Sequence, residues 1–502
     1  MSRLTKNIIY NLLGQTLLLL LGFVSVKYIF GRLGEDALGI IYFTSMLNAI
    51  SISMLQMGIC SLTVREISSN YEDNPKYCHD LIRTGSFFFW TIFVLLGIVI
   101  YFLAPIIVEK WINLETIDTA TAIYVLRILL IGSLVALPQS LYTSLFTGLE
   151  RMEFSNIIGV GTSVLRQFGT IFILANGGDL FSVAYFYVFC YGISIFISLV
   201  FLAKFFPLRS FIPGYFSHVV KKNIGFASMM SFQTIIGAIY GQADKLIVSK
   251  LMSVGTLGYY VFAGGIASQG TAVASSISRA AYPSLSALLA KGNREALMIQ
   301  YKNLQDIICF ITVPVFASMP FACLPLISYV LNEEIARLLF LPISLLSFAF
   351  YIDGTTHIPY YFSLAMGKPN ISAKSLLYQS LFSVPTTIIL VYYYGLVGAG
   401  LSVIFGELFG FAYFILRVCS ECLKISAREW YGHILKILIL ASLTYGSAWF
   451  LLGMIGNYSI LSLTMTYFGA TIGYLVCSYF MINEKLREIL SGYFRLFRKS
   501  VW

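Results

Sequence analysis

The chain carries little charge for its length. Of its 502 residues, 11% are charged and 58% are hydrophobic. An ordinary soluble domain carries about 25% charged residues. Too few charged side chains are therefore present to cover a surface that faces water, and the composition indicates a protein whose surface faces lipid.

Several motifs of catalysis and ligand binding are also missing. No glycine-rich phosphate loop of the Walker type occurs, so direct ATP hydrolysis is not expected. No arrangement of nucleophile and base indicates an enzyme. The eight cysteines are scattered, and the CxxC spacing of Cys419 and Cys422 has no second pair nearby to complete a zinc site. We therefore expect no metal centre and no cofactor.

Long apolar stretches dominate what is present. A helix that crosses a bilayer needs about 20 apolar residues. Stretches of this kind predict an all-α integral membrane protein with about fourteen spans, near residues 8–30, 38–62, 82–107, 119–146, 156–176, 181–203, 223–248, 256–281, 304–331, 335–365, 371–394, 396–418, 431–454 and 458–481.

The distribution of Lys and Arg predicts the orientation of these spans. With a cytoplasmic N-terminus, the inside loops hold most of the basic residues outside the spans, and the outside loops hold Arg32, Lys110, Lys250 and Arg337. This is the excess of basic residues that cytoplasmic loops carry. Both termini are predicted to be cytoplasmic. The net charge of +10 follows mostly from this bias and from a basic tail, Lys485–Lys499, so nucleic acid is not an expected partner.

An internal repeat organises the chain. Ala37-Leu38-Gly39 before the second span matches Thr256-Leu257-Gly258 before the eighth, and the same offset carries Asn74 onto Asn293. Two halves of six spans have the same orientation, so an axis along the membrane normal relates them. The predicted parts are an N-terminal lobe (1–206), a cytoplasmic linker (207–221), a C-terminal lobe (222–423) and two extra spans with a basic tail (424–502).

Two segments resemble a known family. The run Gly241–Lys250, followed by Gly258-Tyr259-Tyr260, is similar to the seventh-helix signature of the polysaccharide transporter branch of the MOP flippase superfamily, and Gly31–Gly34 is similar to its counterpart in the first half. The resemblance implies an O-antigen type of flippase, which moves a polyprenyl-pyrophosphate-linked oligosaccharide across the bacterial inner membrane. Many O-antigen flippases have twelve spans, whereas fourteen are predicted here, as in the lipid II flippase.

Charged residues inside the predicted spans are the candidates for function, because a charge at the bilayer centre costs roughly 2.5–3.5 kcal/mol. Basic residues in a cavity would bind pyrophosphate, and the substrate-binding candidates are Lys27, Arg127, Arg166 and Lys245. Arg65 and Arg279, at inside helix ends, are candidates for the cytoplasmic mouth. For each of these residues, snorkelling to the interface or anchoring of a helix end is the competing interpretation.

The acidic residues within the predicted spans are candidates for coupling transport to an ion. They are Asp244, Asp353 and Glu407, together with His357, which lies one helical turn after Asp353 and therefore on the same face. Such a pair could relay a proton or couple transport to a sodium ion. A buried hydrogen-bonded pair that fixes helix packing, or for Glu407 a bond across a glycine-lined helix contact, is the alternative.

Other functions remain open at this point. A multidrug or toxin extruder of the same fold would favour an acidic cavity, a lipid II flippase would share the pyrophosphate chemistry, and a membrane glycan polymerase would show large outside loops. The expected partners are a lipid-linked oligosaccharide, membrane lipids and a glycan polymerase complex.

Overall fold

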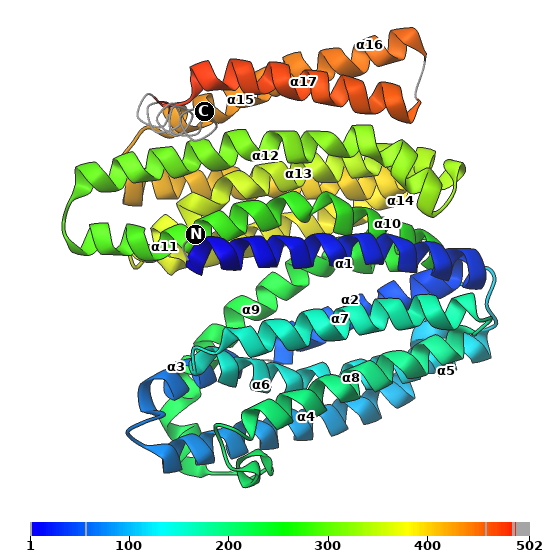
Figure 1. Cartoon of the computed structure of the whole chain (residues 1–502), viewed down its shortest axis with the longest axis vertical. Helices are drawn as coiled ribbons and strands as arrows, with labels where there is room; N and C mark the ends of the chain where they lie inside the picture. The colour runs from blue at the N-terminus through cyan, green and yellow to red at the C-terminus, as the bar shows by residue number, and fades with distance from the viewer. Residues whose placement is uncertain (1–2, 56–57, 457–458, 484–486, 488–502) are drawn as a thin grey trace, which may run out of the picture. The chain divides into compact units, whose positions relative to one another are not determined.

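The computed structural model describes residues 3–55, 58–456, 459–483 and 487, with side chains from residue 17 onward except at 54–55, 225–233, 280, 283 and 290. Apart from Arg487, the predicted basic tail Lys485–Lys499 lies outside the described residues. The described part is helical (Figure 1), and its only β-pairing is a single bridge between Asn113 and Ser253.

Among the described residues, the first half of the chain contains ten α-helices and one short 3-10 helix. They are α1 (Arg3–Leu33), α2 (Glu35–Leu55), α3 (Ile59–Asn70), α4 (Pro75–Lys110), α5 (Thr119–Ser133), α6 (Ala136–Gly148), α7 (Met152–Ala175), α8 (Leu180–Leu202), η1 (Leu208–Phe211), α9 (Ser217–Leu251) and α10 (Val254–Ala267).

The second half adds seven α-helices and two π-helical turns. They are α11 (Gln269–Ala290), α12 (Arg294–Val330), α13 (Glu333–Ala365), α14 (Pro369–Val418), η2 (Cys419–Leu423), α15 (Ala427–Ala441), η3 (Ser442–Gly446), α16 (Ser447–Ile455) and α17 (Ile460–Met481).

The predicted helical class is confirmed, and the described residues of the predicted spans lie mostly in helices. Among the described residues, ten helical stretches are long and apolar enough to cross a membrane. One of them, Pro369–Leu423, contains the two spans predicted at 371–394 and 396–418. The helix breaks between them at Gly395, whose φ of 57° is a conformation that glycine adopts without strain. The count of fourteen spans stays a prediction.

Equivalent positions of the repeat have the same local role. Asn74 caps α4 by accepting a hydrogen bond from the Tyr77 N–H at 3.1 Å, and Asn293 caps α12 by accepting one from the Ala296 N–H at 3.0 Å. Asparagine is a favoured helix N-cap because its side chain satisfies a backbone N–H that has no partner within the helix. The first residues of α4 and α12 are therefore separated by the same number of residues as the repeated sequence segments.

By its contacts the chain divides into two compact units, Met1–Val261 and Phe262–Trp502. Within the first unit, the repeat-equivalent glycines Gly39 and Gly258 lie against each other. A Cβ on Gly39 would lie 2.0 Å from the Val254 carbonyl oxygen, and one on Gly258 would lie 2.9 Å from the Gly39 nitrogen. Helices α2 and α10 therefore approach each other so closely that only glycine fits at Gly39.

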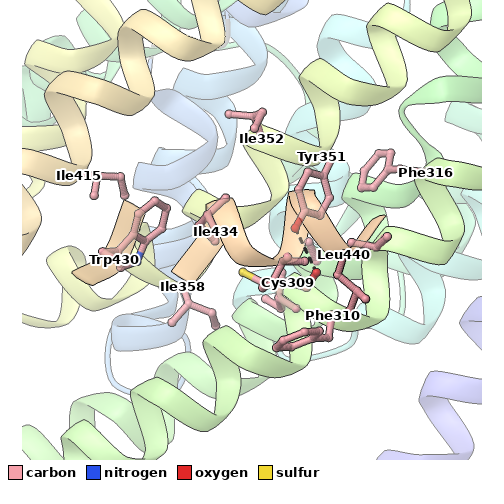
Figure 2. Packing of buried hydrophobic residues seen from close by; sticks show 14 of the residues in the cluster. Cys309, Phe310, Phe316, Tyr351, Ile352, Ile358, Ile415, Trp430, Ile434 and Leu440 are labelled. Carbon is pink, nitrogen blue, oxygen red and sulfur yellow. Dashed lines mark hydrogen bonds between the residues drawn. The ribbon is translucent and has the colours of Figure 1, made fainter. Parts of the chain in front are cut away.

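The second unit contains a large cluster of buried hydrophobic residues, part of which Figure 2 shows. Both C-terminal spans contribute to it, α15 with Trp430 and Ile434 and α17 with Leu463 and Tyr474. Trp430 and Ile434 of α15 pack in this cluster with Ile358 and Ile415. Pro314 lacks the N–H that would bond to the Phe310 carbonyl in α12, and the Tyr474 hydroxyl of α17 donates to that carbonyl at 3.3 Å. The C-terminal spans thus satisfy a backbone group that the proline leaves without a helical partner.

We expect Gly39→Ala to lower the thermal unfolding midpoint of the detergent-solubilised protein, because the added methyl group would overlap the Val254 carbonyl. Forced overpacking costs typically 1–3 kcal/mol, so about that loss of stability is expected. Gly31→Ala is the matched control, since a Cβ there meets nothing within 4 Å. Equal midpoints for the two variants would contradict the close approach of α2 and α10.

Candidate functional site

Arg166 lies near the middle of α7 and faces two tyrosines of α8. Helices α7 and α8 lie side by side (Figure 1). Its guanidinium donates to the Tyr191 hydroxyl at 3.4 Å and lies 5.5 Å from the centre of the Tyr187 ring. Tyr187 and Tyr191 are one helical turn apart, so both present their side chains to the same face. We call these three residues the Arg166 site.

The Arg166 site holds a positive charge that no ion pair among the described residues neutralises. The adjacent Gln167 has a buried side-chain oxygen without a hydrogen-bond partner. A guanidinium can bind a phosphate or carboxylate through two parallel hydrogen bonds, and tyrosine adds a hydroxyl and an apolar ring face. The arrangement is suited to binding an anionic group.

The other basic candidates are held by nearby backbone or side-chain groups. In α5, the Arg127 guanidinium donates to the Tyr101 carbonyl at 3.0 Å and lies 4.1 Å from the Tyr101 ring centre. In α9, Lys245 donates to the Gly241 carbonyl and to the Gln242 side chain at 3.2 and 3.1 Å. Lys27 is partly buried in α1, and the exposed Arg279 donates to Ser275 at 3.2 Å in α11. Arg127, Lys245 and Arg279 thus have contacts that would serve packing equally well.

The neighbours Asp244 and Lys245 have separate partners. Asp244 accepts a hydrogen bond of 2.8 Å from the Tyr260 hydroxyl of α10, whereas Lys245 bonds within its own helix. Successive helical residues project to different faces, which explains the divergence. Asp244 therefore joins α9 to α10.

Asp353 and His357 lie on one face of α13, as predicted. The distance from Asp353 Oδ2 to His357 Nε2 is 3.5 Å, and the side chains are 40% and 21% exposed. Glu407 is partly buried in α14. Both side chains of the pair on α13 are therefore partly exposed.

Glu66 of α3 is a charged centre that the sequence did not single out. One carboxylate oxygen lies 2.6 Å from the Arg65 guanidinium, and the other lies 3.0 Å from Lys222 Nζ and 2.9 Å from the Tyr77 hydroxyl. Asn223 donates to the same tyrosine at 2.9 Å. The carboxylate is buried, and it joins α3, α4 and the start of α9.

The environment of Glu66 favours its ionised form. Burial alone would raise its pKa, but hydrogen bonds from Arg65, Lys222 and Tyr77 outweigh burial and hold the pKa below its usual value. The bond to Glu66 correspondingly raises the pKa of Lys222. Arg65, predicted at a cytoplasmic mouth, is therefore part of an ion-paired junction between helices.

Comparison with known proteins gives the family. Residues 4–289, more than half of the chain, match the family described as polysaccharide biosynthesis protein. The chain belongs to this family. The matched region contains the Arg166 site, Glu66 and Asp244, and it ends before Asp353 and His357. No curated protein matches the sequence.

Solved structures show that this family member has the fold of MOP superfamily transporters, as its resemblance predicted. An inward-facing multidrug resistance MATE transporter has a TM-score of 0.67 at 15% identity, covering 80% of this chain and 95% of its own. The lipid II flippase MurJ, in an inward closed conformation, has a TM-score of 0.64 at 15% identity, covering 93% and 98%. A MOP transporter from Pyrococcus furiosus has a TM-score of 0.54 at 15% identity, covering 81% and 93%.

Two further buried carboxylates join segments of this family member. Asp36, in the first turn of α2, accepts the N–H groups of Glu115, Thr116 and Ile117 at 2.8, 2.6 and 3.1 Å. In the second unit, Asp306 of α12 lies 3.0 Å from His433 of α15 and accepts the Asn483 N–H at 2.9 Å. Their partners are distant in the sequence, so no local pattern could have revealed them.

We expect Glu66→Gln to destabilise the protein at neutral pH, by roughly the 1.5–3 kcal/mol of a hydrogen bond to a charged group. Folding lowers the pKa of Glu66. The carboxylate therefore stabilises the folded protein at pH values above its unfolded-state pKa of about 4.3, and this stabilisation is lost as the pH falls through its folded-state pKa. Unfolding midpoints measured from pH 7 down to about pH 3 should therefore differ at neutral pH, and those of wild type and Glu66→Gln should converge only below about pH 4.3.

Glu153→Gln is the control for that measurement. Glu153 pairs with Arg151 at 3.4 Å, but both side chains are exposed, so the pair contributes little. A midpoint difference between wild type and Glu66→Gln that stays constant over this pH range would show that the Glu66 charge does not stabilise the junction.

Proposed function

We propose that the protein is a flippase that moves a polyprenyl-pyrophosphate-linked oligosaccharide from the cytoplasmic to the periplasmic leaflet of a bacterial inner membrane. Three findings support this: membership of the polysaccharide biosynthesis protein family, the MOP transporter fold, and a cation within a span. Movement would follow alternating access, in which the substrate path opens to one side at a time. A polymerase that consumes the repeat unit would be the partner on the far side.

The Arg166 site carries the proposal. A charge within a span is costly and is kept where it serves a pathway or a partner. Arg166 has aromatic neighbours and no ion pair among the described residues, so it remains available to an anion. In a low-dielectric cavity, a cation attracts pyrophosphate much more strongly than it would in water. The tyrosine rings beside it would contact the sugars.

The alternatives differ in the charge that they need. A multidrug extruder that accepts cations would be disfavoured by an unneutralised arginine on its path. A lipid II flippase would use the same pyrophosphate chemistry, and the fold alone does not separate it from an oligosaccharide flippase. A glycan polymerase would need catalytic groups, and the Arg166 site supplies neither nucleophile nor base.

We expect Arg166→Ala to reduce surface glycan roughly tenfold to a hundredfold while the protein still accumulates in the membrane, since charge-assisted hydrogen bonds contribute about 1.5–3 kcal/mol. Arg166→Lys should retain part of the activity, because lysine keeps the positive charge but cannot form the bidentate hydrogen bonds of arginine to a phosphate. Glycan is measured by gel electrophoresis and the protein by immunoblot.

Lys436→Ala is the control for loss of a basic residue, because Lys436 is exposed on α15. Normal glycan in cells that carry Arg166→Ala would remove the Arg166 site from the transport path. Normal glycan with loss of lipid II transport in the same variant would instead favour the lipid II alternative.

The pair on α13 is proposed to couple transport to a proton gradient. His changes charge between about pH 5 and 8, and Asp353 lies one helical turn away, so the two groups can share a proton. Sodium coupling would use the Asp353 carboxylate without the histidine. The family match ends before these residues, so the coupling rests on their geometry alone.

We expect Asp353→Asn to slow proton-driven flipping in vesicles several-fold while leaving the unfolding midpoint nearly unchanged, because the side chain is 40% exposed. His357→Gln should shift the pH dependence of the transport rate. Both quantities are measured on the same preparations. A lowered midpoint with transport loss in proportion to folded protein would instead show that the pair is structural.

A further inference from the structure

The second unit contains a cavity of about 330 Å³ between the bundle of α12 and α13 and the C-terminal segment formed by α15, η3 and α16. Its walls are mainly apolar and aromatic, and the large lining side chains are Phe316, Phe321, Phe348, Tyr351, Tyr445 and Trp449. Phe316, Tyr351 and the neighbouring Leu440 appear together in Figure 2. The cavity is partly open at the surface of the helices. We call it the α12–α15 cavity.

The polar groups around this cavity are few, and most already have partners. The Tyr351 hydroxyl donates to the Cys309 carbonyl at 3.2 Å, the Ser344 hydroxyl donates to the Phe340 carbonyl at 2.7 Å, and the Tyr445 hydroxyl donates to Thr471 at 3.2 Å. The Ser347 hydroxyl has no partner although the residue is only 3% exposed. A stable buried water needs two to four polar partners, so this lining is a poor site for water.

The cavity lies in the part of the protein that faces lipid chains. The stretches that form it, Arg294–Val330, Glu333–Ala365 and Ala427–Ile455, are all long and apolar enough to cross a membrane. Lining residues such as Phe316, Ser347 and Tyr445 lie far from the ends of these stretches. One wall is the π-helical turn η3, Ser442–Gly446, and π-turns within helices occur frequently at functional sites.

We propose that the α12–α15 cavity binds one acyl chain of a membrane phospholipid, which fills the space between the bundle and the C-terminal spans. The apolar lining suits a hydrocarbon chain and excludes a headgroup or a sugar. The cavity volume of about 330 Å³ lies at the lower end of the range of about 300–1,000 Å³ that is typical of small-ligand sites, and a single chain segment fits such a space. The site is separate from the Arg166 site and does not depend on what the protein transports.

The test compares two leucine variants of the full-length protein. Gly446 lines the cavity, and a Cβ there meets nothing within 4 Å, so Gly446→Leu places a side chain in the open space. Gly432 on α15 is equally open but lies outside the lining, so Gly432→Leu is the matched control. Dioleoylphosphatidylglycerol is added to the delipidated proteins, and native mass spectrometry counts the bound lipids.

Wild type and Gly432→Leu should each hold one phospholipid that survives detergent washing. Gly446→Leu should show at least about a tenfold drop in occupancy, because leucine takes the place of several methylene groups that each contribute about fourfold to binding. A second variant, Ala317→Leu, fills the cavity from α12 and should give the same loss. Thermal unfolding confirms that each variant is folded.

Ser347→Ala distinguishes the chemistry of the occupant. It should leave phospholipid occupancy unchanged, because an acyl chain accepts no hydrogen bond from the serine. Loss of binding in Ser347→Ala would indicate a polar ligand and overturn the proposal. Equal occupancy in Gly446→Leu and Gly432→Leu, or displacement of the phospholipid by an equimolar polyprenyl phosphate, would also overturn it.

Discussion

The lack of hydrogen-bonding partners in hydrocarbon is the constraint from which the structure follows. Every backbone group inside a bilayer must bond within the protein, and the described residues meet this by forming helices almost throughout. Where a helix departs from regular geometry, another group of the protein supplies the missing hydrogen bond, or the break lies between spans. The Tyr474 hydroxyl bonds to the carbonyl that Pro314 leaves without a helical partner, and the break at Gly395 falls between two predicted spans.

The same constraint separates the charged residues into two groups. The carboxylates of Asp36, Glu66 and Asp306 are buried, and each accepts hydrogen bonds or ion pairs from segments distant in the chain. These groups join segments that are distant in the chain. Arg166 and Asp353 are only partly buried within spans and have few partners. Fewer partners leave a charge available to a ligand, which is why we place function in the second group.

The sequence predicted the helices well because hydropathy is a local property. The positions of apolar runs, the break near Gly395 and the repeat that pairs Asn74 with Asn293 all follow from neighbouring residues or from direct comparison of segments. The pairing of His357 with Asp353 was also predictable, because it depends only on helical periodicity. Such features need no knowledge of how distant segments pack.

The junction at Glu66 could not be predicted for the opposite reason. Its partner Lys222 is 156 residues away, directly after the predicted linker 207–221, and no neighbouring residue links it to Glu66. Likewise, nothing near Gly39 shows that the Val254 carbonyl approaches it. The repeat identified Gly39 and Gly258 as equivalent, but their contact depends on the positions of α2 and α10.

The fold and the charges carry different information about function. Proteins with this fold include a multidrug resistance transporter and a lipid II flippase, at 15% identity to this chain in both cases. At that distance the fold constrains how a substrate path could open and leaves the substrate undecided. The sign of the charge on the path then becomes the discriminating property, because a buried cation repels a cationic drug and attracts a phosphate with comparable strength. In the proposed function, Arg166 therefore bears on the substrate more directly than the arrangement of the spans does, because it contacts two tyrosines and no carboxylate among the described residues.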